Sequence, residues 1–124
     1  MPSEAVGWDM YDPRLTTKVV LAEACDLADC MYVHTDGLAY LSDNDEDKCH
    51  GCALKAGAIG DTMTLIRNGR LRMVTAQTPG SNVQTPNLGS GVGSPPDDGG
   101  AGPIVGYAAE TYLIIVAIDS TSTT

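Results

Sequence analysis

Residues 102–119, GPIVGYAAETYLIIVAID, constrain the fold of this chain more than any other stretch. Within them, residues 112–118 are a run of β-branched and large apolar side chains with a single alanine and no charge. Such a run predicts a buried strand that completes a sheet. It is too short to cross a bilayer, which takes roughly 20 apolar residues. We therefore expect this segment to close the core of the protein, and we expect no membrane partner.

The composition predicts one domain with an aliphatic core. The chain has 124 residues, of which 43% are hydrophobic, but it contains one Trp and no Phe. A chain of this length buries roughly two thirds of the surface that its unfolded form exposes. We therefore expect a single core of Val, Leu, Ile, Ala and Met side chains.

The charge is strongly negative. Seven basic and sixteen acidic residues give a net charge of -9. Such a surface repels phosphate backbones, so we expect no nucleic-acid partner. The first ten residues lack the basic start and the apolar stretch of a signal peptide, which predicts synthesis in the cytoplasm.

Two dipeptides predict tight hairpins. Asp36-Gly37 and Asn68-Gly69 each lie between two short runs of β-forming side chains. Both dipeptides favour the two-residue type I′ turn, because its two central residues take positive φ. Pairing across the first turn would place Val33 opposite Tyr40. Together with the absence of an amphipathic helix, these turns predict an all-β fold, a small barrel or a sandwich.

The N-terminal residues 1–16 have no clear hydrophobic period and predict an extended arm. They include Trp8 and Tyr11 among acidic and small residues. Rigid aromatic side chains are common interface anchors, so the two residues could fix the arm on a partner. The alternative is that they pack back on the body of their own domain.

The remaining chain, residues 17–119, would be the β-barrel domain, followed by a flexible tail at residues 120–124. Within the domain, residues 77–103 hold seven of the fourteen glycines and five of the seven prolines, and no basic residue. This composition predicts a long loop, and loops of that length are usually functional or disordered.

Four cysteines form the most suggestive group of side chains. Cys25 and Cys30 are separated by four residues, and Cys49 and Cys52 by two. Two such pairs resemble a tetrahedral zinc site, because a C-x2-C turn directs both sulfurs at one ion, and His50 could replace one sulfur. A structural metal, disulfides and free thiols all stay open on spacing alone. A zinc ion with four protein ligands would have no open position for catalysis, so its role would be structural.

Arg67, Arg70 and Arg72 are the only basic cluster. Around a two-residue turn, all three would project from one face of the hairpin. They would then either form a solvated hairpin tip or dock against an acidic neighbouring subunit.

Motifs of catalysis are absent from the sequence. It contains no G-x-S-x-G elbow, no phosphate loop and no H-E-x-x-H. A redox role for Cys49 and Cys52 would need a βαβ unit, which the sequence does not predict. We therefore do not expect an enzyme.

The order of these pieces resembles the small capsid decoration proteins of tailed bacteriophages, also called cement or head-stabilising proteins. The resemblance rests on YVHTDGLAYLSD, KAGAIGDTMTLIRNGRLRMV, a TPG turn, the Gly/Pro-rich loop and PIVGYAAETYLIIVAI, and it covers residues 17–119. It implies a small β-barrel or β-tulip domain preceded by an extended arm. It implies no required cofactor, and the four cysteines depart from the family pattern, which leaves a structural zinc or disulfides open.

The resemblance also implies a structural virion protein that binds the outer surface of the capsid and bridges major capsid subunits. Its partner would be the major capsid protein, and its oligomer a homotrimer. The 77–103 loop would make the trimer or lattice contact. The residues expected to contact the shell are Trp8, Tyr11, Arg67, Arg70 and Arg72. The alternatives are a head-fibre base or tail component, a small zinc-binding interaction module, and a thiol-based enzyme.

Overall fold

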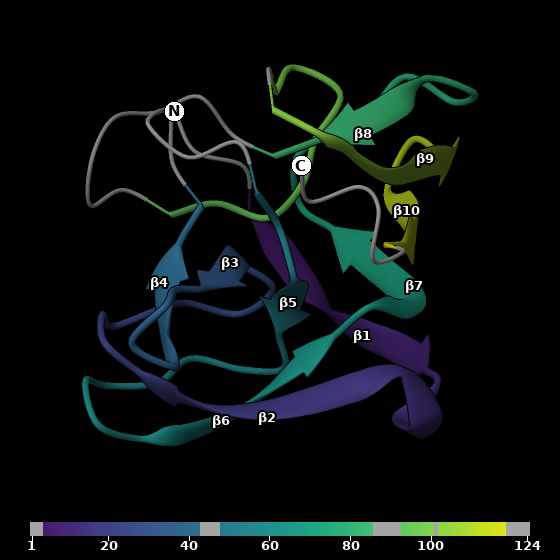
Figure 1. Ribbon diagram of the computed structural model, residues 1–124. Coiled ribbons are helices and arrows are strands. Elements are labelled where there is room, and N and C mark those ends of the chain that lie inside the picture. The colour runs from purple at the N-terminus through teal and green to yellow at the C-terminus, as the bar shows by residue number, and fades with distance from the viewer. Residues whose placement is uncertain (1–3, 43–47, 86–92, 101, 119–124) are drawn as a thin grey trace.

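The computed structural model describes residues 4–42, 48–85, 93–100 and 102–118. These residues form two five-stranded sheets (Figure 1). The first, called here the open sheet, has the order β1-β7-β10-β9-β8, and the second closes on itself as a ring in the order β2-β4-β3-β5-β6. The prediction of an all-β, barrel-like fold is therefore confirmed.

The strands are short, as expected for a chain with many glycine-rich turns. The open sheet consists of β1 (Ala5–Tyr11), β7 (Asn68–Met73), β8 (Asn82–Gln84), β9 (Ile104–Glu110) and β10 (Leu113–Ala117). The ring consists of β2 (Thr16–Leu21), β3 (Cys30–Val33), β4 (Leu38–Leu41), β5 (Gly51–Ala53) and β6 (Thr62–Ile66). A 3-10 turn, η1 (Pro13–Leu15), joins β1 to β2. Among the described residues, no helix is long and apolar enough to cross a membrane.

Alternation along the ring strands divides the buried side chains into two cores. Successive residues of a strand point to opposite faces, so in β3 Met31 belongs to the core inside the ring while Cys30 faces the open sheet. The core inside the ring, called the ring core, contains Val19, Leu21, Cys25, Met31, Ala39, Leu41, Ala53, Met63 and Leu65. The core between the ring and the open sheet, called the interlayer core, contains Ala28, Cys30, Cys49, Cys52, Leu71, Met73, Val83, Val105, Ala108, Ile114, Val116 and Ile118.

A two-stranded antiparallel ribbon runs through both sheets. β1 pairs with β7 in the open sheet, and β2 pairs with β6 in the ring. At the junction, the Asp12 backbone N–H donates to the Asn68 carbonyl (3.0 Å), and the Arg67 N–H donates to the Leu15 carbonyl (3.0 Å). The ribbon therefore holds the two layers together with backbone hydrogen bonds as well as with apolar contacts.

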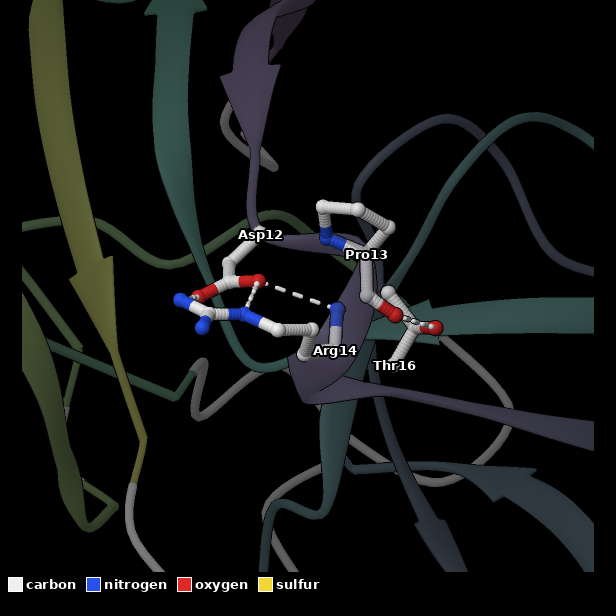
Figure 2. A network of polar contacts seen from close by, with 4 residues as sticks. All are labelled: Asp12, Pro13, Arg14 and Thr16. Carbon is white, nitrogen blue, oxygen red and sulfur yellow. Dashed lines mark hydrogen bonds and ion pairs between the residues drawn. The ribbon is translucent and has the colours of Figure 1, made fainter.

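The ribbon bends at η1, and Asp12 fixes the bend (Figure 2). Its carboxylate accepts from the backbone N–H of Arg14 (2.9 Å) and from two nitrogens of the Arg14 guanidinium (3.1 and 3.0 Å). The Thr16 hydroxyl donates to the Pro13 carbonyl (2.9 Å) and closes the turn. Pro13 suits the first position of this turn, where no N–H is needed.

The predicted N-terminal arm is wrong for residues 5–11, because these residues form an edge strand of the open sheet. β1 pairs with β7 from Ala5 opposite Met73 to Tyr11 opposite Gly69. The register shifts twice, between Ala5 and Gly7 and again between Trp8 and Met10. Each shift interrupts the alternation of side chains, which explains why the sequence shows no period there.

The two predicted turns have different outcomes. Asp36-Gly37 joins β3 to β4 in a hairpin as predicted, but the loop has three residues, with φ +83° at Gly37. The His34 N–H donates to the Leu38 carbonyl (3.0 Å), so Tyr40 faces Tyr32 and not Val33. A three-residue loop that ends in a left-handed residue is the commonest alternative to a two-residue hairpin loop.

Asn68-Gly69 is not a hairpin turn, and that prediction is wrong. β6 ends at Ile66 and pairs with ring strands, whereas β7 begins at Asn68 and pairs with β1 and β10. Arg67 carries the chain from one sheet to the other. The dipeptide's local preference is overridden because each flanking run finds a long-range partner.

The segment 102–119 forms the predicted buried strand and a second strand before it. β10 lies between β7 and β9 at the centre of the open sheet. β9 carries Gly106 opposite Val116, and a Cβ at this glycine would lie only 1.9 Å from the Ile115 carbonyl oxygen. Gly106 therefore allows β9 and β10 to approach.

The predicted 77–103 loop contains more order than its composition suggests. It includes β8, and residues 94–96 are buried. The Ser94 carbonyl accepts from the Cys30 N–H (3.0 Å), so this segment covers the start of β3. Residues 86–92 and 101 of the loop, and the predicted tail at 120–124, lie outside the described residues.

Candidate functional site

Three of the four cysteines meet in the interlayer core. Cys30 in β3 lies directly opposite Cys52 in β5, and Cys49 precedes β5. The sulfur atoms of these three residues all lie within 4.8 Å of one another, and each residue is 0% exposed. The structure contains all four cysteines as free thiols and shows none of the disulfides that the spacing left open. The three residues, called here the thiol cluster, are close enough to bind one metal ion.

Cys25 does not join the thiol cluster. It belongs to the ring core, and its sulfur lies 3.8 Å from the Lys55 carbonyl oxygen. Burial raises the pKa of Cys25 to about 11, so this thiol holds its proton. Of the four predicted cysteine ligands, the structure therefore brings together only Cys30, Cys49 and Cys52.

The other predicted ligand, His50, faces the backbone of β3. Its Nδ1 accepts a hydrogen bond from the Val33 N–H (2.8 Å). Asp29, next to Cys30, is 4% exposed and accepts from the Asp26 N–H (2.9 Å) through its carboxylate. Among the described residues, neither side chain belongs to the group that could share one ion.

The thiol cluster is polarised. Hydrogen bonds from the thiols of Cys30 and Cys52 hold the pKa of Cys49 well below its usual range. Burial raises the pKa of Cys30 well above its usual range. One sulfur thus carries negative charge more readily than its neighbours, and an apolar surround strengthens the attraction of that charge for a cation.

A second candidate site is the outer face of the open sheet. One row of directly paired residues crosses all five strands: Met10, Arg70, Ile115, Tyr107 and Asn82. Met10 is 61% exposed and Tyr107 is 48% exposed. Arg70 has no hydrogen-bond or ion-pair partner among the described residues and lies between Met10 and Ile115. The row therefore presents apolar side chains around one unpaired cation.

A shallow groove of about 580 Å³ lies at one end of this row. Its lining includes Met10, Tyr11, Arg14, Asn68, Arg70 and Ile115. The structure thus brings Tyr11 and Arg70, two of the predicted capsid contacts, to the same groove. The row and the groove are called here the outer face.

The other three predicted contact residues lie differently. Trp8 packs against the interlayer core, and its indole N–H donates to the Ala53 carbonyl (3.2 Å), so it fastens β1 to its own domain. Arg72 forms an ion pair with Asp9 (3.0 Å). Arg67 lies at the crossing between the sheets, where its buried Nε has no hydrogen-bond partner among the described residues. Only Arg70 and Arg72 share a face, because they alternate with buried residues along β7.

Sequence reasoning missed the apolar members of the outer face. Met10 and Ile115 belong to residue types that are often buried, and Tyr107 belongs to an intermediate type. A signal existed in β7, where the sequence NGRLRM alternates small or apolar with polar side chains and the structure shows the matching burial pattern.

Comparisons of the chain with protein-family models, with curated proteins and with solved structures find no match.

Proposed function

We propose that this chain is a structural virion protein that binds the outer surface of a tailed-phage capsid, as a homotrimer, and stabilises the shell by bridging major capsid subunits. The observation that carries the proposal is the outer face of the open sheet, which no other element of the described chain covers. The resemblance over residues 17–119 supports the same conclusion. A head-fibre base or a tail component is the alternative that uses the same face.

The chemistry of the outer face suits a protein partner. Met10 and Tyr107 supply exposed apolar area, and aromatic and arginine side chains are the common anchors of interfaces. Arg70 would pair with a carboxylate of the capsid protein, which would orient the partner at the centre of the row. A protein that binds only the assembled shell stabilises that shell by mass action.

The first experiment compares Arg70→Glu with Lys18→Glu in co-sedimentation with expanded capsids that lack decoration. Lys18 is exposed on β2, away from the outer face, and its variant changes the net charge equally. We expect the wild type and Lys18→Glu to bind alike and Arg70→Glu to bind at least about tenfold more weakly, because a carboxylate replaces the paired cation.

Equal binding by the two variants would remove the outer face from the contact. A wild-type chain that ignores capsids but binds isolated tails would favour the tail component. Light scattering tests the oligomer separately: a strict monomer at all concentrations would contradict the trimer.

The thiol cluster carries a second proposal, a structural metal ion that ties β3 to β5 on the side of the ring that faces the open sheet. Zinc is the ion that the cysteine spacing predicts, and three buried thiols within 4.8 Å support metal binding. Ligands from β3, β5 and the residue before β5 would lock segments that lie far apart in the sequence. Elemental analysis of the purified protein should find about one metal ion per chain, and a chelator should lower the melting temperature.

A further inference from the structure

Building on the proposal that the thiol cluster holds a metal ion, we infer that its ligand is a soft, three-coordinate ion, Cu(I) in preference to Zn(II), bound by Cys30, Cys49 and Cys52 without Cys25. The number of ligands is the first reason. Structural zinc is almost always bound by four ligands in a tetrahedron. The described residues offer three sulfurs within 4.8 Å of one another and no nitrogen or carboxylate oxygen in the same group.

Three other described residues carry possible ligand atoms, and none of them belongs to the group that could share one ion. The Cys25 sulfur lies in the ring core beside the Lys55 carbonyl. The Nδ1 atom of His50 accepts from the Val33 N–H. The Asp29 carboxylate accepts from the Asp26 N–H. Each of the three thus makes a contact within the fold, and none of them belongs to the group whose ligand atoms lie within 4.8 Å of one another.

The surroundings of the cluster also disfavour water as a fourth ligand. All three cysteines are 0% exposed and pack among apolar side chains of the interlayer core, which include Leu71 and Val105. A water bound there would have few polar partners, and buried water normally makes about three hydrogen bonds. A site with three sulfurs and no water suits an ion that is stable with three ligands.

The ligand type is the remaining reason. Thiolates are soft ligands that select Cu(I) and Zn among the available ions, and Cu(I) forms stable trigonal complexes with three sulfurs. A trigonal ion with metal–sulfur bonds of about 2.3 Å would space its sulfurs by about 4 Å. The sulfur atoms of the cluster lie within 4.8 Å of one another, which is compatible with that spacing. The thiol protons leave to solvent as the ion binds.

The experiment titrates the reduced, metal-free full chain under anaerobic conditions, in parallel with Cu(I) as its acetonitrile complex and with Zn(II). Chromophoric chelators for each ion measure the affinities, and X-ray absorption counts the sulfurs around the bound metal. We expect one Cu(I) per chain with three sulfurs, bound at least about 100-fold more tightly than Zn(II).

Four cysteine-to-serine variants complete the test. Cys30→Ser, Cys49→Ser and Cys52→Ser should each weaken Cu(I) binding at least about tenfold, whereas Cys25→Ser, a matched loss of a buried thiol, should leave it unchanged. Circular dichroism of each metal-free variant separates loss of a ligand from loss of the fold. If one variant does not fold, the sulfur count in the wild type still decides the outcome.

Two results would overturn the inference, and they differ in what else they remove. Tighter binding of Zn(II) than of Cu(I) would overturn the choice of Cu(I) and leave a structural metal in place. The same holds if X-ray absorption finds a fourth sulfur in the wild type that disappears in Cys25→Ser. Binding of neither ion would overturn the metal proposal as well. Neither result depends on capsid binding.

Discussion

At the scale of single residues, Gly106 is fixed by the distance between two backbones. A Cβ there would lie 1.9 Å from the Ile115 carbonyl oxygen, and a backbone atom cannot move aside as a flexible side chain can. We expect Gly106→Ala to lower the free energy of unfolding by about 2–3 kcal/mol, because β9 must shift away from the central strand β10.

The matched control for this prediction is Gly7→Ala in the edge strand β1. A Cβ at Gly7 would meet no atom within 4 Å. We expect its free energy of unfolding to stay within about 0.5 kcal/mol of the wild type. Denaturant titration measures both variants, and equal effects would show that the close approach of β9 and β10 does not limit stability.

The burial of Asp29 makes the stability of the folded protein depend on pH, and it determines the sign of that dependence. Burial raises the pKa of this carboxyl to about 6 in the folded protein, against an ordinary value of 3.8. The folded state therefore retains a proton that the unfolded state releases, and stability falls as the pH rises from about 4 to about 6. Asp29→Asn should be more stable than the wild type at pH 7, by at most about 3 kcal/mol, and equally stable near pH 4.

Asp61→Asn is the control, because Asp61 makes the same type of contact on the surface. Its carboxylate accepts from the Ala58 N–H (2.9 Å), as that of Asp29 accepts from the Asp26 N–H (2.9 Å). Thermal melts from pH 4 to pH 8 would compare the three proteins. An Asp29→Asn curve parallel to that of the wild type would contradict the assignment.

At the scale of elements, β1 depends on the one tryptophan of the chain. Trp8 packs on the interlayer core and donates to the Ala53 carbonyl of β5. We expect Trp8→Ala to lower the free energy of unfolding by about 2–4 kcal/mol, since an aromatic side chain and its hydrogen bond are lost together.

Met10→Ala provides the comparison on the same strand. Met10 is 61% exposed, so its truncation should change the stability by less than about 0.5 kcal/mol. Denaturant unfolding followed by circular dichroism suits both variants, because the tryptophan signal is lost in one of them. Similar losses would mean that β1 is held by its backbone pairing with β7 alone.

The sequence predicts those elements whose local pattern agrees with their long-range pairing. The apolar run at 112–118 and the turn at Asp36-Gly37 are of this kind. β1 could not be predicted because two register shifts break its alternation. Asn68-Gly69 misled for the opposite reason: its local preference is strong, but β6 and β7 pair with different strands.

In the candidate site, too, the local sequence pattern predicts one part and long-range strand pairing decides the rest. Spacing identified the cysteines as a group, but the pairing of Cys30 with Cys52 across β3 and β5 decides which three sulfurs meet. The alternation of β3 and β5 then turns Cys30 and Cys52 toward the open sheet, and Cys49 joins them in the interlayer core. Cys25 stays in the ring core, and no local pattern could have shown that.

At the scale of the whole molecule, the negative charge should make stability depend on salt. The net charge is -9, and the described residues form only two ion pairs, Asp12–Arg14 and Asp9–Arg72, both at the surface. Such pairs contribute little, so self-repulsion should dominate. Raising NaCl from about 0.05 to about 0.5 M should increase the free energy of unfolding by about 1 kcal/mol, as salt screens the repulsion.

Urea titrations at the two salt concentrations check this prediction. An uncharged osmolyte at the same osmolality separates screening from exclusion at the protein surface. A decrease in stability with NaCl would mean that attractive pairs outweigh the repulsion of the excess carboxylates.

The position of β10 also determines when the protein can fold during its synthesis. β10 is made after all the other described strands, yet it lies between β7 and β9 at the centre of the open sheet. Until it leaves the ribosome, β7 exposes an unpaired edge with apolar residues beside it, a template for wrong pairing between nascent chains. Because the pairs β1–β7 and β7–β10 join residues far apart in the sequence, folding should take about milliseconds to seconds once β10 is available. A cell that makes many copies of such a chain at once would depend on its chaperones during that interval.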